Sequence, residues 1–128
     1  MQENFIPNPL PIDPAEEIKI MEVEAEPYPD KRRVKVNFTL SSFTHGPSAL
    51  VTLTFNSIQL ASVNIVNIFV PENEITIHIP GGSVKPGMYQ VELDLFFIIE
   101  AEDVNGEETT IHLQQSHLDN TSLSFTIQ

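Results

Sequence analysis

The chain contains no cysteine, and this absence excludes several kinds of site at once. Without thiols there are no disulfides, no thiolate metal ligands and no cysteine nucleophile. The absence also favours a reducing compartment, because disulfides are typical of oxidising ones. Tryptophan is absent too, and there are only two tyrosines, so the sequence is poorly supplied with the aromatic rings on which sugar-binding modules stack their ligands.

Basic residues are scarce, with six Lys and Arg against 18 Asp and Glu, for a net charge of -12. Nucleic acid and anionic membranes repel such a surface, so we expect neither as a partner. No run approaches the ~20 apolar residues of a membrane-spanning helix. The N-terminal sequence lacks the basic and apolar regions of a signal peptide. We therefore expect a soluble, cytoplasmic protein.

Motifs for catalysis and for cofactors are also missing. The four histidines (His45, His78, His112 and His117) do not have the H-x-H or H-E-x-x-H spacing of a zinc site. There is no G-x-S-x-G nucleophile motif and no glycine-rich phosphate loop. We expect no enzymatic activity, no bound metal and no cofactor.

Alternation of apolar and polar residues is the main pattern that the sequence does contain. It is clearest over residues 32–43, where the apolar positions are Val34, Val36, Phe38 and Leu40. Similar segments, separated by turn residues, are 16–29, 48–56, 58–70, 73–80, 85–99, 109–114 and 121–127. No stretch has a capped helical period. Seven or eight short strands predict an all-β fold, an antiparallel β-sandwich over residues 16–128.

The first 15 residues differ from the rest in having prolines at Pro7, Pro9, Pro11 and Pro14. Proline at this spacing excludes helix and favours an extended conformation. We therefore expect residues 1–15 to form an extended, Pro-rich N-terminal arm, which either is disordered or docks on its own or a neighbouring subunit.

A resemblance to a known fold family rests on the stretch Lys85-Pro86-Gly87-Met88-Tyr89-Gln90-Val91. It resembles the start of a late strand in immunoglobulin-like and fibronectin type III-like sandwiches, and the pattern of residues 16–128 is similar to small bacterial domains of this shape. The resemblance implies that Pro86 and Gly87 make a turn and that Tyr89 packs at a corner, bonding the backbone through its hydroxyl. The cysteine pair and tryptophan of antibody domains are absent. A shared fold carries no catalytic residues across.

The same strand becomes apolar on both faces in its second half, "LFFII". If Tyr89 points inward, Phe96 and Ile98 point outward. The Asn105-Gly106 pair predicts a hairpin turn that places Val104 opposite Glu107. In that register Ile98 lies opposite Leu113, and opposed residues share a face.

This register gathers four apolar side chains on the outer face of the hairpin: Phe96, Ile98, Ile111 and Leu113. Continued unchanged, it would also turn the last strand outward, so we expect a one-residue irregularity within residues 115–120. Exposed apolar patches mark interfaces. The alternatives are that the N-terminal arm covers the patch or that the register is off by one.

These observations predict a non-catalytic immunoglobulin-like domain that docks a protein partner or a second copy of itself, most simply as a homodimer. The surface used would be the outer face of the 88–114 hairpin. The alternative is a calcium- or carbohydrate-binding module that uses the acidic loop 100–108, whose carboxylates are ligands that calcium prefers. This loop lacks the spacing of the twelve-residue calcium-binding loop.

Overall fold

The computed structural model describes residues 16–81 and 84–128, without the side chains of residues 101–105. The predicted N-terminal arm, residues 1–15, lies outside the described residues. The described part is all β and contains no helix. Its strands are β1 (Ile20–Pro27), β2 (Arg33–Leu40), β3 (Ser48–Phe55), β4 (Ile58–Ile65), β5 (Glu72–His78), β6 (Gly87–Asn105) and β7 (Glu108–Ile127).

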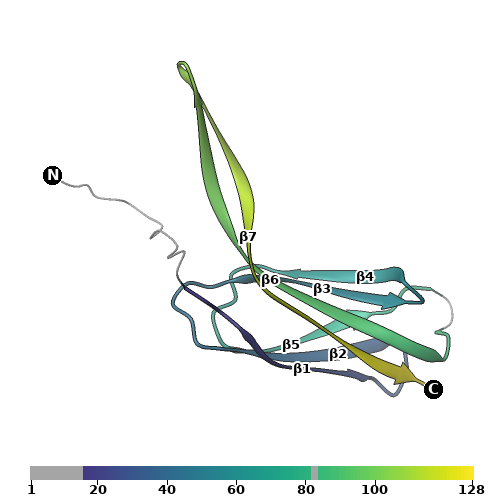
Figure 1. Ribbon diagram of the computed structural model, residues 1–128. Coiled ribbons are helices and arrows are strands. Elements are labelled where there is room, and N and C mark those ends of the chain that lie inside the picture. Colours follow the sequence, from purple (N-terminus) through teal and green to yellow (C-terminus); the bar gives the residue numbers. More distant parts are fainter. Residues whose placement is uncertain (1–15, 82–83) are drawn as a thin grey trace.

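The strands form two antiparallel sheets that face each other across one core (Figure 1). The three-stranded sheet has the order β1-β2-β5, and the four-stranded sheet has the order β4-β3-β6-β7. The alternation predicted over residues 32–43 is confirmed, because the four apolar residues of β2 are all buried: Val34, Val36, Phe38 and Leu40. Burial of each such side chain contributes about 1.5–3 kcal/mol, so the alternating pattern holds the sheets together.

β1 contains a bulge at Met21, where the pairing with β2 shifts between Ile20 and Glu22. The sequence changes its inward parity here, from Ile18 to Val23, which is the sign of an extra residue in a strand. Met21 is that residue, and it is 66% exposed. Ile18, before the bulge, lies in the core, and Val23, after it, packs against the core.

Tyr89 locks the start of β6 to the rest of its sheet. Its side chain is buried, and its ring stacks on the rings of Phe55 and Phe125, with 4.5 Å and 5.8 Å between the ring centres. Its hydroxyl donates a 2.6 Å hydrogen bond to the Lys85 carbonyl. Gly87, in the turn before it, has a φ of 143° and lies so close to the Phe55 ring that a Cβ would come within 3.0 Å. Glycine suits both demands.

The two last strands are more than twice as long as the others. β3 pairs with β6 only as far as Phe96, so beyond this point β6 and β7 pair with each other alone. Figure 1 shows this part rising from one end of the sheets as a two-stranded ribbon. We call residues 98–115 the distal hairpin. At about 3.4 Å per residue it extends roughly 25 Å.

Candidate interaction surface

The distal hairpin closes one residue later than the sequence predicted. The turn consists of Gly106 and Glu107, with Asn105 opposite Glu108. Gly106 has a φ of 67°, which suits a two-residue hairpin turn with glycine first. Ile98 therefore lies opposite Gln115 instead of Leu113, and the predicted register was wrong by two residues.

A shift of two residues preserves the faces of the ribbon, because side chains alternate with a period of two. Ile98, Ile111 and Leu113 therefore still share one face, and they are 38%, 58% and 68% exposed. We call these three side chains the apolar face. Glu100 pairs with Leu113 across the ribbon, so an exposed carboxylate lies on the same face as the apolar side chains.

Phe96 does not belong to this exposed surface, contrary to the prediction. It is only 7% exposed, although it lies outside the main core cluster. The physical reason is local: Phe96 is the last residue of β6 that pairs with β3, opposite the buried Ser48, so it still lies within the four-stranded sheet. The expectation that all four apolar side chains are exposed is thus wrong for Phe96.

The irregularity expected within residues 115–120 is present at that same place. Asp119 pairs with Leu95 and His117 with Phe96, so Leu118 is the extra residue. The shift returns the end of β7 to the core, where Phe125 packs against the core and Ile127 is buried.

Asp119 fixes the base of the distal hairpin to the opposite sheet. Its Oδ2 accepts a 2.8 Å hydrogen bond from the Ile20 backbone N–H of β1. This bond is the main cause that lowers the pKa of Asp119 below its ordinary value, and a bond from the Asn120 N–H acts in the same direction. The Asn120 side chain in turn donates to Asp94 and Glu92 of β6. Hydrogen bonds from β7 to β1 and to β6 therefore hold the hairpin in place where it leaves the sheets.

A second exposed apolar group lies in the loop between β4 and β5, and sequence reasoning missed it. Phe69 is 87% exposed, with Val66 and Val70 beside it in the chain. The loop lies at the end of the molecule from which the distal hairpin rises, because Ile68 N–H donates to Pro47, next to the start of β3. The signal in the sequence was the apolar run of residues 68–70 directly before Pro71, which was assigned to a strand over residues 58–70.

The acidic loop 100–108 proves to be the tip of the distal hairpin. Glu107 and Glu108 are exposed there, and the proposed calcium ligands Glu102 and Asp103 lie outside the described side chains. Among the side chains that the structure describes, no group of three or more His, Asp or Glu is arranged to hold a metal ion.

The ring of His45 contacts a carboxylate at the start of the described chain. Its Nδ1 lies 3.2 Å from Glu16 Oε1, and Glu16 also accepts a bond from the Thr44 backbone N–H. That backbone bond is the main cause that lowers the pKa of Glu16. The pair ties the start of the described chain to the loop before β3, which is a structural role.

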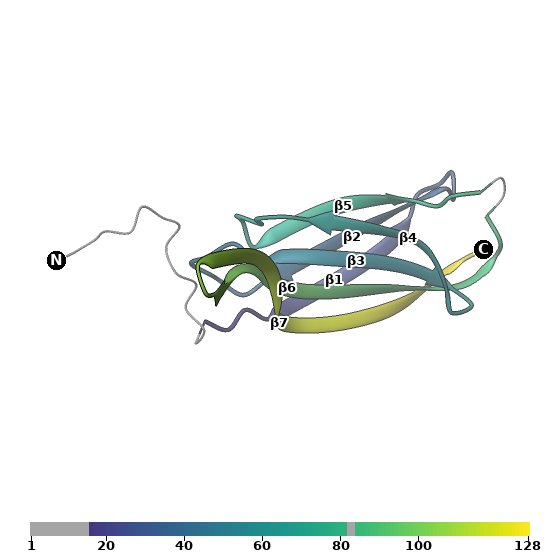
Figure 2. The ribbon, with the colours of Figure 1, turned by 90° about the horizontal axis from the view of Figure 1, so that it is seen from above.

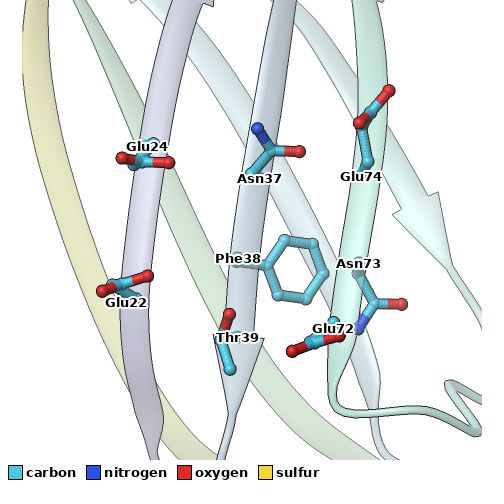
Figure 3. A pocket seen from close by; sticks show the side chains of 8 residues that line it. All are labelled: Glu22, Glu24, Asn37, Phe38, Thr39, Glu72, Asn73 and Glu74. Carbon is cyan, nitrogen blue, oxygen red and sulfur yellow. The ribbon is translucent and has the colours of Figure 1, made fainter.

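The outer face of the three-stranded sheet is acidic in one half (Figure 3). Glu22, Thr39 and Glu72 form one row across the strands. A second row contains Glu24, Asn37 and Glu74. These residues line a shallow, open hollow, with Phe38 contributing from the buried side.

The other half of this face carries the positive charge. Lys35 lies 3.8 Å from Glu26, and the Arg33 guanidinium lies 4.3 Å above the centre of the Tyr28 ring. Arg33 also pairs with Asp30 in the turn between β1 and β2. Beside them is a hollow of about 280 Å³, lined by Glu26, Pro27, Tyr28, Pro29 and Lys35. We call residues 26–35 the basic end.

Comparison with known proteins gives no relative: no family model, no curated protein and no solved structure matches the chain. Within the described residues, no helix is long and apolar enough to cross a membrane.

Proposed function

We propose that this protein is a non-catalytic interaction module that associates with a second copy of itself through the distal hairpin. The single observation that carries the proposal is that β6 and β7 continue beyond the sheets while exposing Ile98, Ile111 and Leu113.

The length of the hairpin supports the proposal that a second chain binds it. A two-stranded ribbon without a third strand is at best marginally stable in water. Beyond Phe96 the described chain supplies no third strand, since β3 stops pairing there. A second chain that packs on the ribbon would supply the missing contacts.

The apolar face supports the same conclusion. Complete burial of an aliphatic side chain contributes about 1.5–3 kcal/mol, and three such side chains are exposed on one short ribbon. Phe69 extends the exposed apolar surface at the same end of the molecule. Concentrations of exposed apolar atoms on a soluble protein are typical of protein interfaces.

We also propose that the fold is immunoglobulin-like, closest in type to the fibronectin III sandwiches. Two features support this. The strands divide as the first, second and fifth in one sheet and the third, fourth, sixth and seventh in the other. The hydroxyl of Tyr89, near the start of β6, bonds the backbone four residues upstream, which is a feature of such domains.

Sedimentation velocity over a wide range of concentrations tests the proposed association. Leu113→Asp places a charge on the apolar face, and Thr110→Asp places the same charge on the opposite, also exposed face of the same strand. We expect the wild type to associate, Leu113→Asp to weaken association at least ~10-fold, and Thr110→Asp to change it less than ~3-fold. A monomeric wild type, or equal effects of the two variants, would contradict the proposal.

A further inference from the structure

The distal hairpin combines its apolar face with charge of a single sign. Residues 98–115 include five acidic residues and no Lys or Arg. Glu100, Glu107 and Glu108 are exposed. A surface that receives this hairpin must therefore offer both apolar contact and positive charge.

The chain itself offers such a surface at its basic end. Residues 26–35 contain four of the six bases of the whole sequence, against two acids. Arg32 is exposed there, and the hollow formed with Pro27, Tyr28 and Pro29 is lined by Lys35 and by Glu26, which lies 3.8 Å from it. The proline rings and the tyrosine give this hollow an apolar lining beside the Lys35–Glu26 pair, and the four bases of the segment leave it net positive.

The two surfaces cannot meet within one copy. Figures 1 and 2 show the distal hairpin at one end of the sheets and the β1–β2 turn, together with the C-terminus, at the other. Lys31 confirms the place of this turn, because its Nζ donates to the backbone carbonyl of the last residue, Gln128. Two complementary surfaces at opposite ends of a molecule are suited to join successive copies.

We infer that the distal hairpin of one copy docks on the basic end of the next copy, so that the protein assembles head to tail. The inference rests on the proposed self-association and specifies its geometry. Leu113 or Ile111 would enter the hollow beside Tyr28, while Glu100, on the same face as Leu113, and Glu107, in the turn, face Arg32 and Lys35. Such an interface is heterologous, and it produces an open chain or a ring instead of a closed dimer.

The symmetric alternative is less favourable in its charges. If two distal hairpins packed on each other, the acidic residues of both would lie in one interface. Like charges opposed across strands are destabilising, and at an interface they select against a partner. No base on the hairpin could offset this repulsion, since residues 98–115 contain none. The charge pattern therefore favours the head-to-tail arrangement.

A charge-swap experiment separates the two arrangements. The hairpin variant is Glu100→Lys with Glu107→Lys, and the end variant is Arg32→Glu with Lys35→Glu. Head-to-tail docking predicts that each variant alone associates at least ~10-fold more weakly than the wild type. An equimolar mixture of the two should recover assembly, because each hairpin then meets an end of opposite charge. Circular dichroism and melting of each variant check that the fold is intact.

Each other result has a definite meaning. If the end variant assembles like the wild type, or if the mixture fails to recover assembly, the head-to-tail geometry is wrong. If Leu113→Asp still weakens association in that case, self-association through the hairpin stands. The hairpin then docks on the hairpin of the second copy or on a surface of that copy other than the basic end. A wild type that stays monomeric overturns both the geometry and the proposed function.

Discussion

Replacement of Tyr89 by phenylalanine removes one hydroxyl and leaves the packing of the ring in place. The ring is 2% exposed and stacked between Phe55 and Phe125, and both contacts persist in the variant. What disappears is the 2.6 Å hydrogen bond to the Lys85 carbonyl. A net hydrogen bond contributes about 1 kcal/mol, and a partner left unsatisfied in a partly buried site raises the cost to at most about 2 kcal/mol.

Urea unfolding followed by fluorescence or circular dichroism measures this difference. We expect Tyr89→Phe to lower the free energy of unfolding by about 1–2 kcal/mol without changing the slope against urea. For a domain of this size the melting temperature should fall by roughly 3–8 °C.

The second tyrosine provides a matched control. The Tyr28 hydroxyl lies 3.2 Å from Thr76 Oγ1, but on the outer face of the sheet and less deeply buried. Tyr28→Phe should therefore cost less than about 0.5 kcal/mol. If Tyr89→Phe costs no more than Tyr28→Phe, the idea that the Tyr89 hydroxyl holds the start of β6 is wrong.

Three further predictions concern stability. Asp119→Asn should lower the free energy of unfolding near neutral pH by no more than about 1 kcal/mol, because solvent screens this carboxylate. Because the pKa of Asp119 is lowered in the folded state, the ionised carboxylate stabilises the fold at pH values above the ordinary Asp value of 3.8. This stabilisation is lost as the pH falls through the folded pKa. The free energy of unfolding of the variant should therefore depend less strongly on pH in this acidic range. Gly46→Ala places a Cβ 2.3 Å from the Ile68 carbonyl oxygen and should cost about 1–3 kcal/mol in urea unfolding. Replacement of residues 100–113 by Asn-Gly should change the free energy of unfolding by less than about 1 kcal/mol, since no side chain of the core cluster is removed; a larger fall would show that the hairpin supports the sheets.

The sequence was sufficient to predict the strands and the inward residues of most of them. Alternation identified the buried side of β2 and of β6, and turn residues identified most of the connections. These signals are local, because a strand with one buried face must place apolar residues at every second position. The extension of the last two strands beyond the sheets could not be predicted in this way. It depends on where β3 stops pairing, which is a property of two segments far apart in the chain.

The loop with Phe69 shows a second limit. Alternation ends after Ile65, and the apolar residues that follow were assigned to the strand. An apolar run is equally consistent with a buried strand and with an exposed apolar loop, because periodicity alone does not distinguish them. Only the structure shows that Phe69 is the most exposed of the large apolar side chains in the described part.

The two errors in the hairpin were different in kind, and the difference explains why the apolar face was still predicted. A turn that closes one residue later shifts the pairing by two, and since the side-chain period is also two, every residue keeps its face. A bulge shifts one strand by a single residue and exchanges its faces. Met21 is the extra residue of such a bulge in β1, whereas Phe96 keeps its face and is buried because it still lies opposite Ser48 of β3. Ile98, Ile111 and Leu113 all lie between the turn and the bulge, where parity alone decides the face. Their common face therefore follows from the alternation in either register, and only a further bulge within residues 98–115 would turn them to the other side.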